Sequence, residues 1–281
     1  MRRPKLPHEA RTPQPMKRPV TPAQASAVAI AGITDVGRHR KRNEDAIDWD
    51  ARLGLAMVAD GMGGNQGGDV ASVTALRSIK NDLRRALAEA HRNAERAQSR
   101  DVRGSLVAEL VRRANQSVRQ SAGRDPRLNG MGTTLVMCLV GKGYLTVAHV
   151  GDSRLYRLRG RKLERLTEDH TMVQELVERG DMSARQAAQS RNRNVITRAL
   201  GLSPDVAVDI AHHELEPGDL YMLCSDGLTG MATDADISDV LDSATASLDE
   251  TARRAIELAN ARGGRDNVSV VLLKVPEKSH G

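Results

Sequence analysis

Short apolar segments joined by very short turns constrain this chain more than any other feature. Four of them follow one another between residues 133 and 166, with turns at residues 141–143 and 160–161. Strands joined so closely pair antiparallel, because a parallel crossover needs about a dozen residues or more. Similar segments cover residues 27–33, 46–50, 53–60, 206–215, 219–227 and 267–275. The pattern therefore predicts antiparallel sheets.

Helical patterns occur in groups between these strand segments. Apolar residues recur at steps of three and four over residues 70–87 and 106–118, and a third pattern covers 248–261 before Gly263 and Gly264. Two short helices are expected at residues 170–179 and 184–189. Helices and strands do not alternate regularly, and most strands are apolar on both faces. We therefore predict an α+β fold in which two packed sheets are covered by helices.

The first 22 residues differ from the rest of the chain in composition. They hold six of the ten prolines. They also hold much of the excess positive charge of the chain, whose formal net charge is +6. Such a segment cannot bury enough apolar surface to fold, so we predict a disordered basic tail. The nearly neutral remainder and the scarcity of aromatic residues (1% of the chain) argue against a nucleic-acid-binding protein.

The sequence predicts neither a membrane span nor a disulfide. No apolar run approaches the length of about 18 residues that a membrane helix needs. Cys138 and Cys224 each lie within an apolar run, where a buried, reduced thiol is the simpler interpretation. We therefore expect a cytoplasmic protein.

Four aspartates lie beside the ends of apolar strands, close to glycine. Asp60, Asp152 and Asp226 follow such strands, and Asp266 precedes the last one. A single aspartate in this position usually caps a turn. Four carboxylates that converge would repel one another unless a cation neutralises them, and an all-oxygen ligand set favours Mg²⁺ or Mn²⁺ over zinc.

A basic loop supplies the complement to these acids. Residues 38–42 contain three arginines and one lysine, directly before Glu44 and Asp45. Arginine presents a planar set of donors suited to phosphate oxygens. Phosphoester chemistry requires cationic side chains that bind the substrate beside carboxylates that bind metal ions. Taken alone, however, the loop is also typical of an ordinary solvated surface.

Together these motifs resemble the bacterial members of the protein phosphatase 2C family over residues 28–275. The resemblance is carried, in order, by ITDVGRHRKRNEDA, VADGMGGNQGGDVAS, GMGTTLV, VAHVGDSRLYRLR, LTEDHTMVQELVERG, NVITRALG, LCSDGL and GGRDNVSVVLL. It implies a four-layer αββα sandwich of two antiparallel sheets flanked by helix pairs. It also implies a catalytic domain over residues 23–276 with a flap subdomain at about 168–200, followed by a short tail at 277–281.

The resemblance assigns metal ligands residue by residue. Asp60 would bridge two Mn²⁺ or Mg²⁺ ions, Asp226 and Asp266 would hold the first, and the Gly61 carbonyl the second. Asp152 would bind a third, weaker ion.

The resemblance also assigns the residues that act beside the metals. Glu44 and Asp45 match the family's acidic pair, which acts largely through metal-bound water, so Asp45 counts among the metal residues. Arg40 matches the arginine that grips phosphate, and Asn267 matches the asparagine beside the last metal aspartate. Met62 stands where eukaryotic members carry a histidine, the candidate general acid.

The function that these matches imply is hydrolysis of phosphoserine and phosphothreonine in proteins by a water molecule that two metal ions activate. We expect a monomer that opposes a bacterial Ser/Thr kinase. Three alternatives are a hydrolase of other phosphoesters, a phosphoprotein-binding module with little activity, and a role centred on the basic tail as a tether to nucleic acid or an anionic surface.

Overall fold

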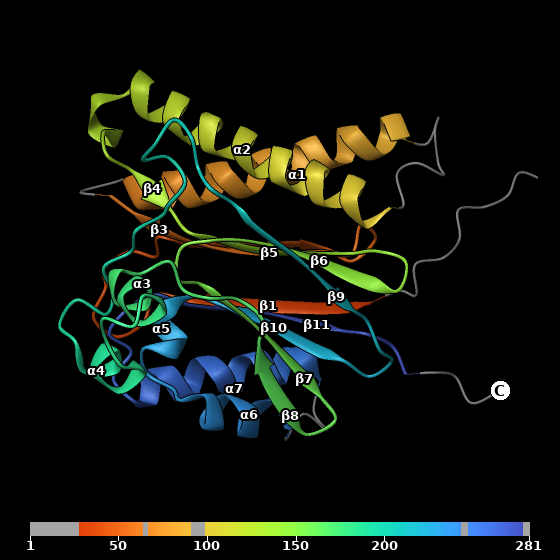
Figure 1. Ribbon diagram of the computed structural model, residues 1–281, viewed down its shortest axis with the longest axis vertical. Helices are drawn as coiled ribbons and strands as arrows, with labels where there is room; N and C mark the ends of the chain where they lie inside the picture. Colours follow the sequence, from red (N-terminus) through yellow and green to blue (C-terminus); the bar gives the residue numbers. More distant parts are fainter. Residues whose placement is uncertain (1–27, 64–66, 91–98, 243–246, 278–281) are drawn as a thin grey trace, which may run out of the picture.

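Two antiparallel sheets lie face to face, with helices on both outer faces (Figure 1). The structure, a computed structural model, describes residues 28–63, 67–90, 99–242 and 247–277. The predicted tail at 1–22 and nearly all of the one at 277–281 lie outside the described residues. The α+β sandwich expected from the sequence is confirmed.

Each sheet is assembled from strands far apart in the sequence. The first has the order β1 (Ala29–Asp35), β11 (Val268–Lys274), β10 (Leu220–Cys224), β7 (Arg154–Arg159) and β8 (Lys162–Arg165). The second has the order β2 (Asp45–Asp50), β3 (Leu55–Met62), β5 (Leu135–Val140), β6 (Tyr144–Val150) and β9 (Asp209–Glu214), and the short β4 (Gly132–Thr133) also pairs with β3. Both predicted hairpins, β5–β6 and β7–β8, are present.

Helix pairs cover the two outer faces, and three apolar cores join the four layers. The long helices α1 (Gly67–Ala90) and α2 (Arg100–Arg124) pack on the second sheet through a core that includes Ile79 and Val111. The helices α6 (Asp234–Asp242) and α7 (Leu248–Ala261) pack on the first sheet around Ile237 and Ile256. The core between the sheets consists of strand residues such as Val136, Leu145 and Val271. The sequence did not predict α6.

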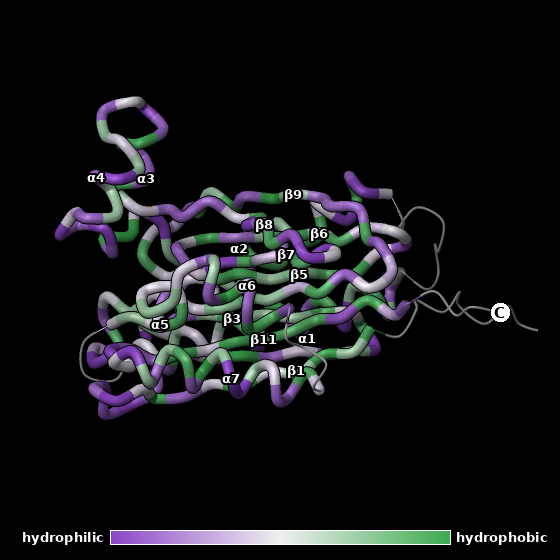
Figure 2. Tube along the Cα trace, turned by 90° about the horizontal axis from the view of Figure 1, so that it is seen from below, coloured by the Kyte–Doolittle hydropathy of each residue, from purple (hydrophilic) through white to green (hydrophobic). Residues whose placement is uncertain are grey.

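One end of the sandwich carries the smaller elements. The helices α3 (Met172–Glu178) and α4 (Ala184–Gln189) project from the layers in Figure 2. A β-bridge between Thr171 and Ile196 draws together the two ends of this 168–200 segment. The helix α5 (Asp226–Thr229) begins two residues after β10, and the short 3₁₀ helix η2 (Pro126–Leu128) follows α2.

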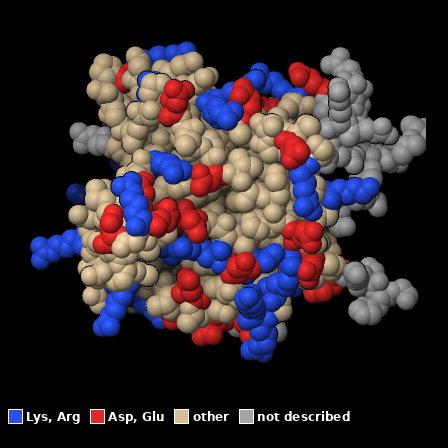
Figure 3. All heavy atoms as spheres, viewed as in Figure 1, with Lys and Arg blue, Asp and Glu red and all other residues tan. Residues whose placement is uncertain are grey.

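The charged side chains and the two thiols are distributed as follows. On the face in Figure 3, basic and acidic side chains are interspersed rather than gathered into one basic patch. No helix in the described ranges has the length and apolar character needed to span a membrane. Cys138 and Cys224 are buried and free, and burial raises the pKa of each thiol to about 12.

Candidate active site

The predicted acidic residues converge at the end of the sandwich that carries α5. Asp45 and Asp60 are directly paired across β2 and β3, and Asp226 is the first residue of α5. Burial raises the pKa of the Asp60 carboxyl well above its ordinary value, and the charges of four other carboxyls raise it further. These are Asp45, Asp226, Asp152 and Asp266. Asp60 lies within β3 rather than at its end, because Gly61 and Met62 continue the strand by pairing with β4.

Asp45 shows how the fold holds a carboxylate and leaves one of its oxygens available. The hydroxyls of Ser225 and Ser269, both fully buried, donate to Asp45 Oδ2 at 2.7 Å each. Asp45 Oδ1 is buried and has no hydrogen-bond partner, and the same is true of Asp226 Oδ1. Burial is the main reason that the pKa of Asp45 rises to about 6. Buried carboxylate oxygens without a donor fit a site for a hard cation.

The backbone around Asp60 is fixed by two threonines. Thr134 Oγ1 accepts from the Asp60 amide at 3.0 Å, and the Thr134 amide donates to the Asp60 carbonyl at 2.8 Å. The Thr133 hydroxyl donates to the same carbonyl at 2.9 Å. Asp60 is therefore mounted on rigid backbone, which a closely defined ligand geometry requires.

Asp152 lies on the short loop after β6 and is 8% exposed. Burial, followed by the charge of Asp226, raises the pKa of its carboxyl to about 7. The preceding residue, Gly151, is bound twice to His170: its amide donates to His170 Nδ1 at 3.1 Å and its carbonyl accepts from the His170 amide at 2.8 Å. The position of Asp152 is thus tied to the start of the 168–200 segment.

The side chain of Arg40 extends from its loop to Asp266, one of the acidic residues. Its Nη2 donates to Asp266 Oδ2 at 2.7 Å, and about half of its side chain remains exposed (52%). The Asp266 hydrogen bond is the main cause that raises the pKa of Arg40. The predicted phosphate-gripping arginine therefore lies beside the acids, with its cationic group accessible from solvent.

Glycines allow the first turn of α1 to approach β3 and Glu44. A Cβ on Gly61 would lie 2.0 Å from the Gly68 carbonyl oxygen, and one on Gly68 would lie 2.7 Å from Glu44 Oε1. Only glycine fits at either position. Burial is the main cause that raises the pKa of Glu44.

Asn267 binds the basic loop rather than reaching toward the carboxylates. Its Oδ1 accepts from the Glu44 amide at 2.8 Å, and its Nδ2 donates to the carbonyls of Val36 at 3.0 Å and Arg42 at 2.9 Å. One buried side chain therefore fixes the segment that carries Arg40 and Glu44.

Sequence reasoning missed the residues that support the acids. Ser225 and Ser269 bind Asp45, and Thr134 binds Asp60. One signal was available for Ser269: it is a small polar residue in a strand, Val268–Lys274, that is otherwise apolar up to Leu273, and a buried hydroxyl there needs a partner. No residue near Ser269 in the sequence indicates that its partner is Asp45.

A second polar cluster lies behind Asp152. His149, His170 and Asp209 bring one potential ligand atom each within 4.8 Å of one another, as a metal site would. However, His170 Nδ1 accepts from Gly151, so its proton is on Nε2, which lies 3.1 Å from Asp209 Oδ2. The Arg198 guanidinium also binds Asp209, at 3.0 Å, and already neutralises it. These contacts favour a structural hydrogen-bond cluster over a cation site.

Comparisons with known proteins place this chain among phosphatases of known sequence. A sequence description of the family "Protein phosphatase 2C" matches residues 37–261. A serine/threonine phosphatase stp of Listeria welshimeri is 36% identical over 244 residues, covering 86% of this chain and 93% of its own. Protein phosphatase PhpP of Streptococcus pneumoniae is 33% identical, covering 89% and 98%.

Solved structures show the same likeness. The Mycobacterium tuberculosis serine/threonine phosphatase PstP/Ppp superposes with a TM-score of 0.78 at 34% identity, covering 89% of this chain and 99% of its own. A crystal structure of the PstP catalytic domain in complex with two manganese ions has a TM-score of 0.76 at 33% identity, covering 89% and 99%. The fold is thus that of these serine/threonine phosphatases. The chain belongs to the protein phosphatase 2C family.

Proposed function

We propose that this chain is a metal-dependent protein phosphatase that hydrolyses phosphoserine and phosphothreonine. The observation that carries the proposal is the cluster of five buried or half-buried aspartates in which Asp45 Oδ1 and Asp226 Oδ1 have no donor. The stp and PhpP relatives are named phosphatases, which supports the same activity here.

Two Mn²⁺ or Mg²⁺ ions fit this set of oxygen ligands. We infer that the ligands that would hold them are Asp60, Asp226, Asp266 and the Gly61 carbonyl. Glu44 and Asp45 would contribute through water, and Asp152 would hold a third, weaker ion. When bound, such ions lower the pKa of water so that a nucleophile forms at neutral pH.

The side chains of this chain supply orientation and charge. Arg40 presents its guanidinium to the phosphoryl oxygens, where it balances the charge that develops as the phosphoester bond breaks. Its ion pair with Asp266 at 2.7 Å holds it in place. Met62 offers no proton to the leaving serine or threonine oxygen. His170 does not either, since it is buried and both of its ring nitrogens are engaged.

The proposal extends to the cellular role and the domain limits. We propose a cytoplasmic monomer, with a catalytic domain at residues 23–276 and a flap at 168–200, that removes phosphate added by a Ser/Thr kinase. The two free, buried cysteines suit a reducing compartment.

Asp60→Asn and Asp226→Asn test the assignment. Each is expected to lower kcat on a phosphothreonine peptide at least a thousandfold, because each removes a charge that holds a divalent ion. Asp239→Asn is the matched control, since Asp239 is exposed on α6. EDTA should inactivate the wild type, and Mn²⁺ or Mg²⁺ should restore it.

The substrate panel contains phosphoserine, phosphothreonine and phosphotyrosine peptides and nucleotides. Full activity in EDTA, or an Asp60→Asn variant within threefold of wild type, would refute the metal assignment. Efficient hydrolysis of nucleotides alone would instead identify a phosphoesterase of another class.

A further inference from the structure

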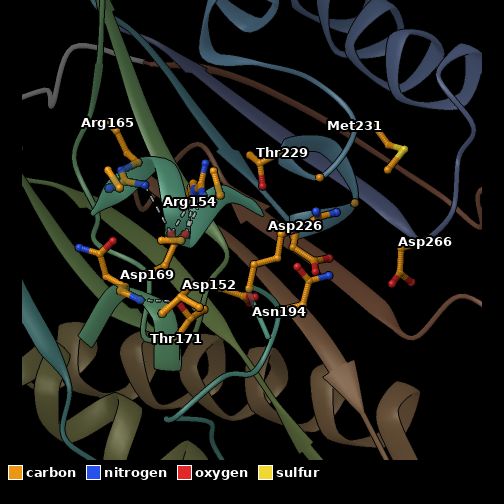
Figure 4. Close-up of a pocket in the computed structure, with 18 of the residues that line it drawn as sticks. Asp152, Arg154, Arg165, Asp169, Thr171, Asn194, Asp226, Thr229, Met231 and Asp266 are labelled. Atoms are coloured by element: carbon orange, nitrogen blue, oxygen red, sulfur yellow. Dashed lines mark hydrogen bonds and ion pairs between the residues drawn. The ribbon is translucent and has the colours of Figure 1, made fainter. Parts of the chain in front are cut away.

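A cleft of about 640 Å³ extends from the acidic cluster to the 168–200 segment (Figure 4). Asp152, Asp226 and Asp266 line it, and so do residues of both α3 and α4. A phosphoryl group bound at the aspartates would therefore place the rest of its substrate in this cleft. The volume is that of a ligand site able to hold several residues of an extended peptide.

Four arginines line the cleft, and they fall into two groups. Arg154 binds Asp169 through Nε and Nη2, the shortest contact being 2.6 Å, and Arg165 lies 3.9 Å from the same carboxylate. Arg193 and Arg265 are exposed, and neither forms a side-chain ion pair or hydrogen bond with any residue that the structure describes. Asp169 is therefore committed to its partners, whereas two cationic groups of the cleft are available to a ligand.

The cleft also has an apolar wall. Val173, Val177 and Ala187 contribute it from α3 and α4, and Met231 contributes it from the residues after α5. An apolar wall excludes water from part of the cleft, which strengthens an ion pair formed beside it.

We propose that this cleft binds the peptide around the phosphorylated residue and that Arg193 and Arg265 select substrates with acidic side chains close to it. The inference rests on the proposed phosphatase function and names its substrate class. The aspartates of the cleft do not repel such a substrate once divalent ions offset their charge. The two arginines then remain as the charges without a counterion.

Three phosphothreonine peptides test the proposal. They are identical except that the residues two positions before and two positions after the phosphothreonine are Glu, Gln or Lys. For the wild type, kcat/KM is expected to fall in the order Glu, Gln, Lys, with about tenfold between Glu and Lys, the size expected for two exposed ion pairs. Arg193→Ala and Arg265→Ala should each lower kcat/KM for the Glu peptide about threefold, and the double variant about tenfold.

Two controls separate recognition from general damage. Arg191→Ala removes an exposed arginine two residues from Arg193 that does not line the cleft, and it should leave the order of the peptides unchanged. Hydrolysis of p-nitrophenyl phosphate, which does not reach into the cleft, should stay within twofold of wild type in every variant.

Each outcome decides the proposal. Equal kcat/KM for the three peptides, or a double variant that keeps the wild-type preference, overturns the acidic selection and leaves the phosphatase function standing. Failure to hydrolyse any of the peptides, together with hydrolysis of p-nitrophenyl phosphate, overturns both the selection and the assignment of protein substrates.

Discussion

Asn267→Ala is expected to release the loop that carries Arg40 and Glu44. The side chain of Asn267 is 5% exposed and makes three hydrogen bonds, all between 2.8 and 3.0 Å, to backbone groups at residues 36, 42 and 44. A buried hydrogen bond contributes about 0.5–1.5 kcal/mol, so loss of all three should lower the free energy of unfolding by about 2–4 kcal/mol. Because the loop bears Arg40, kcat/KM on p-nitrophenyl phosphate should fall by about 10- to 100-fold.

Asn260→Ala is the matched control for this experiment. Asn260 is 9% exposed, and its Nδ2 makes one side-chain hydrogen bond, to Asp35 Oδ1 at 3.1 Å. Its replacement should lower the free energy of unfolding by about 1 kcal/mol and leave kcat/KM within about twofold. Urea denaturation and steady-state kinetics at saturating Mn²⁺ measure both quantities. The reasoning is refuted if the two alanine variants lose equal stability, or if Asn267→Ala keeps wild-type kcat/KM.

Two further variants test the charges at and near the site. Arg40→Ala should lower kcat/KM by about 2–3 kcal/mol in transition-state free energy, and Arg40→Lys should recover only part, because a point charge does not replace the planar guanidinium; wild-type kinetics for Arg40→Ala would contradict its phosphate role. Burial lowers the pKa of His149 to about 4 in the folded chain, against about 6.5 unfolded, so the unfolded state binds the extra proton between these values and wild-type stability falls as pH falls through them. Relative to His149→Asn, the wild type should lose up to about 3 kcal/mol between pH 6.5 and pH 4 in urea denaturation, whereas parallel curves would contradict this origin.

The sequence predicted those parts of the fold whose signals are local. Alternating or continuous apolar runs with glycine turns identify the strands, and the three-to-four spacing identifies α1, α2 and α7, because burial of one face dictates each pattern. Asp60 and Asp226 could be selected from the sequence because each follows an apolar segment and precedes glycine, although Asp60 lies within β3 and not at its end. The short helix α6 was missed, since its nine residues make fewer than three turns and place only Ile237 and Leu241 in the core.

The supporting contacts could not be predicted because they join residues remote in sequence. Ser225 lies 180 residues from Asp45, and Asn267 lies 223 residues from Glu44. Serine and asparagine are ordinary residues in turns and strands, so their presence alone indicates no partner. Only the packing of the sheet that contains β10 and β11 against β2 of the other sheet determines which backbone and carboxylate groups these side chains meet.

The two oxygens of Asp45 explain how such a site is both stable and reactive. Oδ2 accepts two short hydrogen bonds from buried serines, which fixes the carboxylate and favours its charged form. Oδ1, like Asp226 Oδ1, has no donor among the described residues, and burial raises the pKa of both carboxyls. Without the two serine hydrogen bonds, the Asp45 side chain could adopt other rotamers. With a hydrogen-bond donor on Oδ1, that oxygen would not be available as a ligand. Hydrogen bonding on one side and an unmet acceptor on the other therefore support the proposal that the cluster binds a hard cation, which would offset the mutual repulsion of its carboxylates.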